Sequence, residues 1–173
     1  IQAQEMHVNI ILLKIMTTNA IINKGYKMRE ERITMIMNKV ELLAPAGSLD
    51  KLKIAYLYGA DAVYIGGKSY SLRANATNFS DSQIEEAANY AHKLGKKLYV
   101  TVNIVFHNED YKGLVEYLKK LEKFKVDAII SSDPSIIDII NKYKINLDIH
   151  ISTQMSNANY ESALFWKNEG ATR

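Results

Sequence analysis

The stretch that most constrains the fold of this chain covers residues 41–67, ELLAPAGSLDKLKIAYLYGADAVYIGG. It contains two short apolar runs, Leu42–Ala44 and Ala62–Ile65, separated by a Pro-Ala-Gly turn and a helical pattern that ends at Gly59. Strands that pair in parallel through a helix are covered on both faces, so their residues should be nearly all apolar. The stretch is therefore predicted to form one βαβ unit.

Strand-like and helix-like segments continue to alternate after this unit. The predicted strands are Glu41–Ala44, Ala62–Ile65, Lys97–Val105, Asp127–Ser131 and Leu147–Ser152. The predicted helices begin after Ser48, after Ser80 in a capping box with Gln83, over about Glu109–Phe124, after Asp133 with Pro134 at the first position, and over about Asn157–Asn168. The second helix is the best marked, because its apolar residues recur at helical spacing: Ile84, Ala87, Ala88, Ala91 and Leu94.

Five strand–helix units in regular succession predict an α/β fold with parallel strands. Eight units of this size would need about 210 residues, near the lower end of the range for a (β/α)8 barrel. Residues 170–172 have the same place in their unit as residues 59–61, which lead into the second strand. We therefore expect an incomplete (β/α)8 TIM-type barrel of about five βα units, truncated before strand six. An open doubly wound sheet is the alternative, although no G-x-G-x-x-G follows the first strand.

Residues 1–36 carry no sustained hydrophobic period and are predicted to be an N-terminal extension, non-native or poorly ordered. The chain opens with Ile1 in place of Met and has a methionine at Met37, so the native protein is expected to start there. A helical extension is the alternative. The barrel portion is accordingly expected to cover residues 37–173.

Composition limits the classes of partner and cofactor. Lys and Arg number 22 against 19 Asp and Glu, and the formal charge of +3 is too small to argue for nucleic acid by itself. The absence of cysteine excludes a disulfide, a thiolate zinc site or an iron–sulfur cluster held by this chain. The apolar run Ile10–Leu13 is far shorter than the roughly 20 residues of a membrane span. We expect a cytoplasmic protein with no membrane contact and no metal site.

Polar side chains alternate with apolar ones along the third and fifth strands. Residues two apart in a strand share a face, so the polar set should point into the barrel while the apolar set meets the helices. The catalytic candidates are His150, Asn103 and Asp133. The substrate-binding candidates are Arg73, Asn75, Asn103, His107, Thr153 and Gln154, with Ser152 beside them. The alternative is that each is a satisfied polar residue of the barrel interior, or a helix cap in the case of Asp133.

Two glycine turns could bind an anion through free backbone N–H groups. One is Gly47-Ser48 at a helix start, and the other is Gly66-Gly67 after the second strand. Turn formation alone explains these glycines equally well. No G-x-S-x-G or H-E-x-x-H is present, which disfavours a serine hydrolase or a zinc protease. His92 is expected to be a solvated residue on the second helix.

Several ordered blocks carry a family resemblance: ELLAPAGS, GADAVYIGG, NFSDSQIEEAANYAHKLGKKLYVTVN, SDP and HISTQMSN. Together they resemble the N-terminal part of the collagenase-like peptidase family U32. The resemblance implies the start of a (β/α) barrel and two competing activities. Some members are classed as peptidases, whereas others hydroxylate RNA, either tRNA at the wobble uridine with prephenate, or a cytidine of 23S ribosomal RNA. It also implies an iron–sulfur cluster on cysteines beyond residue 173, and no cofactor bound by this chain itself.

Three hypotheses about function follow from the residues and the resemblance. The first is a fragment of an RNA-modification enzyme, inactive alone, in which Arg73 contacts phosphate or a small acid while Asn103, His150 and Gln154 line the pocket. The second is a peptidase acting on a peptide substrate. The third is a non-catalytic barrel subunit in a hetero-oligomer with a second U32-type subunit.

Overall fold

The computed structural model describes residues 40–72 and 78–173. The chain divides into two compact units, residues 1–39 and 40–173, and the described residues all belong to the second. The extension predicted for residues 1–36 lies outside the described part, as do Arg73 and Asn75.

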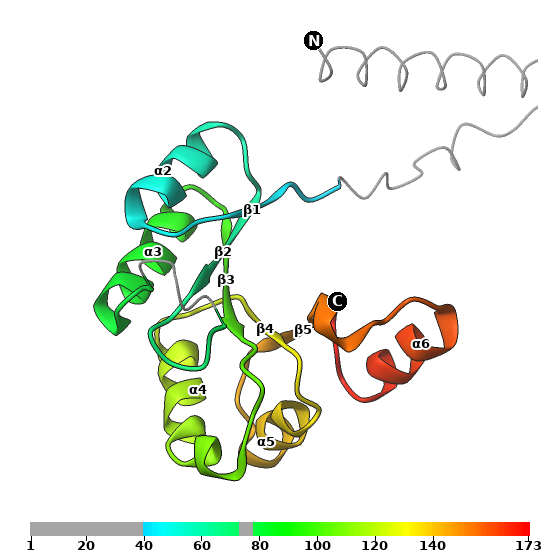
Figure 1. The fold of residues 1–173 in the computed structure, drawn as a ribbon. Coiled ribbons are helices and arrows are strands. Elements are labelled where there is room, and N and C mark those ends of the chain that lie inside the picture. The colour runs from blue at the N-terminus through cyan, green and yellow to red at the C-terminus, as the bar shows by residue number, and fades with distance from the viewer. Residues whose placement is uncertain (1–39, 73–77) are drawn as a thin grey trace, which may run out of the picture. The chain divides into compact units, whose positions relative to one another are not determined.

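Strands and helices alternate through the second unit, and each strand pairs with the next one along the chain (Figure 1). The elements are β1 (Leu43–Pro45), α2 (Leu49–Leu57), β2 (Ala62–Gly66), α3 (Asp81–Lys93), β3 (Lys97–Val102), the 3-10 turn η2 (Asn108–Tyr111), α4 (Leu114–Lys123), β4 (Ala128–Ser131), α5 (Ser135–Tyr143), β5 (Asp148–Ile151), the 3-10 turn η3 (Thr153–Met155) and α6 (Tyr160–Asn168). All four strand pairs are parallel, in the order β1-β2-β3-β4-β5.

This strand order distinguishes between the two predicted architectures. Each crossover moves one strand further in the same direction, whereas a doubly wound sheet reverses its direction after the first half. Winding in one direction is the arrangement of successive units in a (β/α)8 barrel. The predicted fold class, an α/β protein built like the first five units of a barrel, is confirmed.

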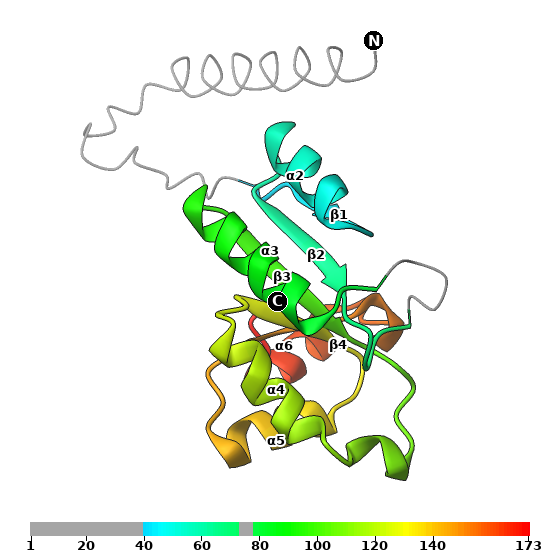
Figure 2. The same ribbon diagram turned by 90° about the vertical axis from the view of Figure 1, so that its left-hand side faces the viewer.

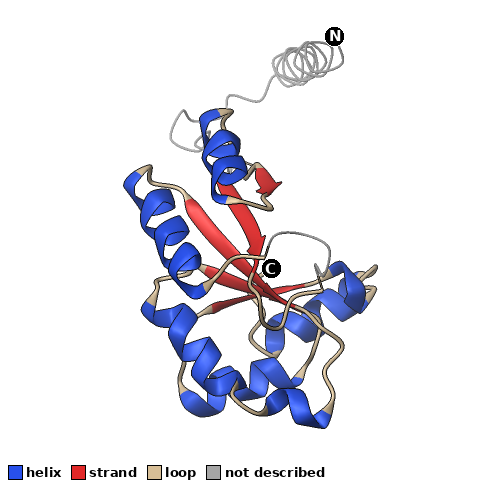
Figure 3. Cartoon of the chain, turned by 60° about the vertical axis from the view of Figure 1, so that its left-hand side comes forward, coloured by secondary structure: helices blue, strands red, loops and turns tan. Residues whose placement is uncertain are grey.

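The two faces of the sheet have different coverings. Leu98, Val100 and Val102 of β3 are fully buried in a large core shared with the helices. Tyr99 lies on the opposite face in a smaller cluster with Ala62 and Ala128, to which no helix contributes a buried residue among the described ones. The helices lie along one side of the curved sheet (Figure 3). The predicted alternation in β3 therefore separates a helix-covered face from an open one.

The starts of α2 and α3 are well predicted because their capping signals are local. Ser80 accepts a hydrogen bond from the backbone of Gln83, whose side chain accepts one in return from Ser80, completing the capping box of α3. Ser48 caps α2 in the same way through Lys51 N. Four of the five predicted stripe residues of α3 are fully buried, but Leu94 is 48% exposed because it follows the last turn of the helix.

The segment after β3 departs from the prediction. The strand ends at Val102 and not at Val105, because the backbone N–H groups of Asn103 and Ile104 turn away to donate to Tyr70 O. The predicted helix over 109–124 is split into η2 and α4, since Gly113 adopts a left-handed conformation with φ of 83° between them. The fifth predicted helix also starts later, at Tyr160 after an Asn159 cap.

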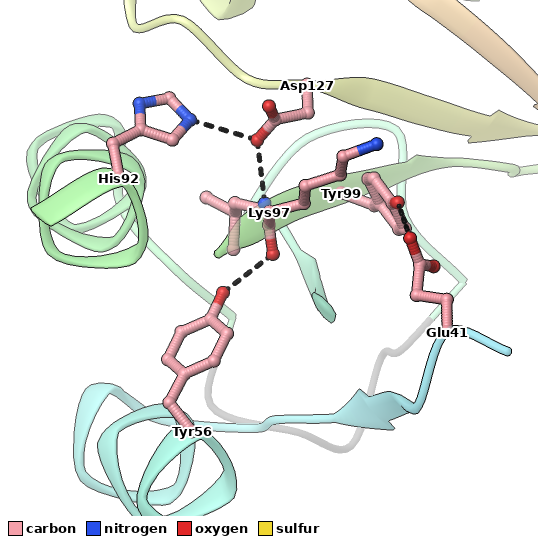
Figure 4. A network of polar contacts seen from close by, with 7 residues as sticks. Glu41, Tyr56, His92, Lys97, Tyr99 and Asp127 are labelled. Atoms are coloured by element: carbon pink, nitrogen blue, oxygen red, sulfur yellow. Dashed lines mark hydrogen bonds and ion pairs between the residues drawn. The ribbon is translucent and has the colours of Figure 1, made fainter. Parts of the chain in front are cut away.

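A set of polar contacts joins β3 to the neighbouring helices and strand (Figure 4). Asp127 Oδ2 accepts a hydrogen bond of 2.8 Å from Leu98 N and lies 3.0 Å from His92 Nε2. On the other side, Tyr56 Oη donates to Lys97 O at 2.8 Å. His92 is exposed on α3, as predicted, and its ring also pairs with the carboxylate that precedes β4.

The free edge of β5 carries two further backbone hydrogen bonds. Thr172 N donates to Ile149 O at 2.8 Å, and Ile151 N donates to Arg173 O at 2.7 Å. Residues 172–173 thus lie along β5, at the position where a sixth strand is predicted to begin.

Gly67 should be sensitive to substitution because a side chain there has no room. A Cβ atom at this position would lie 2.4 Å from Tyr117 Oη, and that hydroxyl is buried with no hydrogen-bond partner among the described residues. We expect Gly67→Ala to lower the free energy of unfolding by about 1–3 kcal/mol through overpacking. Tyr117→Phe should be neutral or stabilising, because it removes an unsatisfied buried hydroxyl.

The double variant tests the cause of this loss. Removing the hydroxyl also removes the clash, so Gly67→Ala with Tyr117→Phe should recover most of the stability, as measured by urea denaturation. If the stability change of the double variant equals the sum of the changes in the two single variants, the clash with Tyr117 is not the reason that position 67 needs a glycine.

Candidate active site

A cavity of about 590 Å³ opens on the helix-free face of the sheet, towards the C-terminal ends of the strands. Its wall is built from β3, β4 and β5 and from the segments that follow β2, β3 and β5. Five predicted residues line it: Asn103, His150, Ser152, Thr153 and Gln154. Apolar lining comes from Leu43, Tyr64, Leu72, Ile130 and Ile151. In barrels, this end of the strands carries the active site.

His150 is the titratable side chain on β5 in this wall. Its residue is only 8% exposed, and its ring meets that of Tyr99 edge-on with centroids 4.6 Å apart. Burial and the nearby Arg173 guanidinium lower the pKa of His150 to about 4. The imidazole is therefore neutral near pH 7, with one nitrogen able to accept a proton and the other able to donate a hydrogen bond.

A chain of hydrogen bonds crosses the mouth of the cavity. Leu72 N donates to Asn103 Oδ1 at 3.4 Å, and Asn103 Nδ2 donates to Gln154 Oε1 at 2.9 Å. Ser152 Oγ reaches the same Gln154 oxygen at 3.1 Å. The loop after β2, the end of β3 and the turn after β5 are thus joined by two side-chain amides. This arrangement holds planar hydrogen-bonding groups in fixed orientations around the opening.

A charged pair on the same face joins residues far apart in the sequence. Glu41 Oε2 accepts a hydrogen bond of 2.7 Å from Tyr99 Oη, as Figure 4 shows, and Glu41 Oε1 pairs with Arg173 Nη1. Although partial burial opposes it, the hydrogen bonds from Arg173 and Tyr99 lower the pKa of Glu41. Burial and the Glu41 carboxylate raise the pKa of Tyr99, which stays protonated as the donor. Arg173 also lines the cavity.

Glu41 and Arg173 were not among the predicted site residues. Glu41 precedes an apolar run and Arg173 follows a helix, so neither position carries a local pattern that marks a site. Tyr99 is one of the polar residues that alternate along β3, and this alternation is the signal that could have identified it.

Two predicted site residues, His107 and Asp133, lie outside the cavity and make hydrogen bonds at the starts of helical segments. His107 begins η2, and its backbone N–H donates to Asp110 Oδ2 at 2.8 Å. Asp133 Oδ1 accepts from Ser135 N at 2.9 Å and from Ser135 Oγ at 2.6 Å, so it caps the start of α5. Neither side chain lines the cavity. The N-cap residue of α5 is Pro134, and Asp133, one residue earlier, bonds the first residue of the helix, which agrees with the capping role that was its alternative.

The glycines proposed to bind anions have close neighbours. A Cβ at Gly66 would lie 2.5 Å from Ser71 Oγ, and one at Gly67 would meet Tyr117 Oη. Close packing therefore accounts for both residues. Gly47 and Ser48 line a separate cavity of about 270 Å³ with Lys68 and Asn78.

The described residues offer few ligands for a metal or a cofactor. Residues 40–72 and 78–173 contain no group of three or more His, Asp or Glu side chains placed to hold a metal ion. The whole chain lacks cysteine, so it supplies no thiolate to an iron–sulfur cluster. For an acidic ligand such as prephenate, Arg173 is the charged side chain that lines the cavity, and it stays 45% exposed although it pairs with Glu41. The described residues therefore offer no metal or cluster site, and one partly neutralised cation to an acidic ligand.

The fold and the cavity define a protein of the (β/α)-barrel class with a pocket of mixed apolar and polar lining at the C-terminal ends of its strands. Residues 47–173 match the sequence model of Peptidase family U32. This match covers most of the chain, and the chain belongs to that family.

Relatives with assigned names share much of this sequence. The "tRNA hydroxylation protein P1" of Bacillus subtilis is 51% identical over 139 residues, which are 80% of this chain and 33% of the relative. The "23S rRNA 5-hydroxycytidine C2501 synthase" of Escherichia coli is 34% identical over 141 residues, which are 82% of this chain and 21% of the relative. The chain thus spans a third or less of these two relatives.

Among solved structures, the "U32 Peptidase Mk0906" has a similar fold, with a TM-score of 0.63 and 14% sequence identity. The match covers 76% of this chain and 56% of that one. It supports the barrel-type fold.

A further structural finding concerns membranes. Within the residues that the structure describes, none of the helices combines the length and the apolar character needed to cross a bilayer.

The low pKa of His150 predicts a pH dependence of stability. Between about pH 4 and the unfolded value near 6.5, the unfolded chain binds a proton that the folded chain does not bind. The free energy of unfolding should therefore fall as pH drops through this window, by up to about 1.4 kcal/mol per pH unit. Above about pH 6.5, His150 contributes no pH dependence to the free energy of unfolding.

Urea denaturation of the natural sequence and of His150→Gln, over about pH 4.5 to 7, measures this effect. The free energy of unfolding of the variant should depend less steeply on pH below about pH 6.5. Above that pH, the curves of the two proteins should have the same slope. Parallel curves throughout the range would contradict a buried neutral imidazole.

Proposed function

We propose that this chain is part of an enzyme that hydroxylates RNA, with tRNA or ribosomal RNA as the substrate. The observation that carries the proposal is the 51% identity to a tRNA hydroxylation protein over 139 residues, which are 80% of this chain. A second relative of the same family is named for a hydroxylated cytidine in ribosomal RNA. Such substrates are consistent with a cytoplasmic protein.

The cavity has groups suited to a planar, neutral base. The amides of Asn103 and Gln154 offer donors and acceptors in one region of the rim, and Tyr64, Leu72 and Ile130 provide apolar lining. His150 remains uncharged near pH 7 and would act as a proton acceptor or donor at the bound substrate. Asn103, Thr153 and Gln154 are proposed to bind the substrate.

Arg173 is the proposed contact for negative charge. Its guanidinium is held by Glu41, but its side chain is 45% exposed, which leaves donors available at the cavity. Arg73 and Asn75 remain predicted substrate contacts in the loop after β2.

A peptidase is the second candidate, because it is the activity after which the family and the structurally similar protein are named. The described cavity gives it less support. Ser152 Oγ bonds to Gln154 and also caps η3, so no described contact pairs this hydroxyl with a base such as His150. A second U32-type subunit stays a prediction. The outer edge of β1 is a place where a strand of such a partner could pair with the sheet.

Deletion of the gene tests the proposed chemistry. Nucleosides from bulk tRNA and rRNA, analysed by mass spectrometry, should lose a hydroxylated pyrimidine in the deletion strain and regain it with the full-length gene. A gene carrying His150→Ala should restore about 100-fold less product, as expected for loss of a general acid or base. Asn103→Ala should restore about tenfold less, through the lost hydrogen bond to the substrate.

His107→Ala is the matched control, since His107 lies outside the cavity, and it should restore the product fully. Unchanged nucleosides after gene deletion would contradict RNA hydroxylation. Cleavage of casein or collagen by the full-length protein, lost in His150→Ala, would favour the peptidase.

A further inference from the structure

Exposed lysines gather where two neighbouring helices end. We define the lysine surface by five exposed residues of α4, α5 and the positions just after them: Lys119, Lys123, Lys125, Lys142 and Lys144. Helices α4 and α5 lie side by side in both ribbon views (Figures 1 and 2). The lysine surface therefore combines charges from two helices on one part of the molecule.

An exposed aromatic ring lies within this surface. Tyr143 is 44% exposed, and the Nζ atoms of Lys119 and Lys142 each lie 5.6 Å from its ring centroid. The ring thus brings together cations from α4 and α5 by cation–π attraction. Lysines interleaved with an exposed aromatic side chain are typical of surfaces that contact nucleic acid.

These lysines differ from others in their partners. Lys53, Lys96 and Lys120 form salt bridges with acidic residues on neighbouring elements. By contrast, none of the five lysines of the lysine surface has a salt bridge with a described residue. The acids on the same helices are Glu116, Glu122 and Asp138, and Glu122 Oε1 accepts a hydrogen bond from Asn146 N at 2.6 Å. The five lysines of the lysine surface therefore outnumber the three acidic residues of α4 and α5, and the surface has a net positive charge.

Backbone conformation gives an independent observation. Each of the five helices ends at a residue with positive φ: Gly59 (99°), Gly95 (64°), Lys125 (60°), Lys144 (51°) and Gly170 (108°). A lysine in this conformation carries a steric penalty that glycine avoids. The negative end of the helix dipole favours a cation at the C-terminus of a helix. However, α2, α3 and α6 have the same dipole and are followed by glycine, so the dipole alone does not explain the two lysines. Among the described residues, the lysines with positive φ are the two that directly follow α4 and α5, the helices that form the lysine surface.

We propose that the lysine surface binds the phosphate backbone of an RNA substrate, an inference that rests on the proposed function. The helices run antiparallel to the strands, so this surface lies at the other end of the sheet from the cavity. A ligand that occupies both places must be large and must carry charge along its length. A folded RNA meets these requirements, and a free nucleotide or a small acid does not.

Binding of bulk tRNA by the whole chain tests the proposal. Affinity is measured as a function of salt for the natural sequence, for a surface variant and for a control variant with the same loss of charge. The surface variant is Lys119→Gln/Lys142→Gln/Lys144→Gly, and the control is Lys51→Gln/Lys93→Gln/Lys167→Gln, whose lysines are exposed on other helices. We expect the surface variant to bind at least about tenfold more weakly near 0.1 M salt, with a salt slope smaller by roughly 2. The control should stay within about twofold of the natural sequence at the same salt.

The outcomes separate this inference from the proposed function. If the natural sequence binds tRNA and both variants bind equally well, the lysine surface is not the RNA site, while RNA modification stands. If the natural sequence does not bind tRNA, the inference fails, while the proposed function is decided separately by the gene deletion. Binding to phosphatidylglycerol vesicles in place of RNA, lost in the surface variant, would assign the surface to a membrane and overturn the inference.

The single variant Lys144→Gly separates the effect of the lost charge on tRNA binding from any effect on stability. Glycine relieves the strained backbone, so the melting temperature should rise by a few degrees while tRNA affinity falls. A purely structural role for Lys144 would leave tRNA affinity unchanged, and that result would remove this lysine from the proposed contact.

Discussion

The structure depends on which face of the sheet each side chain of β3 meets. Leu98, Val100 and Val102 are buried against the helices, while Tyr99 and Thr101 face the open side. A slip of one residue would exchange the two sets and would place polar groups in the core. Asp127 and Tyr56 bind the backbone at the start of β3 from opposite sides, and these contacts help to fix the register.

The cavity follows directly from this division of the sheet. Because β3 and β5 turn their polar side chains to the helix-free face, Asn103, His150 and Gln154 reach one space although β4 lies between the two strands. The same burial that shapes the space keeps His150 uncharged. A pocket with a neutral imidazole, two oriented amides and one arginine suits recognition of a largely neutral group attached to an anionic chain.

The two ends of the sheet differ in how their polar and charged side chains are paired. At the C-terminal ends of the strands, side chains are largely paired with one another and are held in place. At the C-terminal ends of α4 and α5, the five residues of the lysine surface stay exposed without a salt bridge to a described residue, although Lys120 of α4 pairs with Asp81. Two of the five, Lys125 and Lys144, occupy backbone conformations better suited to glycine. Positive charge is thus kept at these two positions against the local backbone preference.

Local patterns in the sequence determined much of this protein. The apolar runs of parallel strands, the Ser80/Gln83 capping box and the alternation in β3 and β5 were each visible within a few residues. They predicted the fold class and five of the twelve residues that line the cavity. Tertiary structure alone decided the contacts between distant segments. Glu41 meets Arg173 across 132 positions of sequence, and His92 meets Asp127 across 35. Such pairs depend on how whole strands and helices pack, so no short pattern reveals them, whereas capping and alternation depend only on neighbours along the chain.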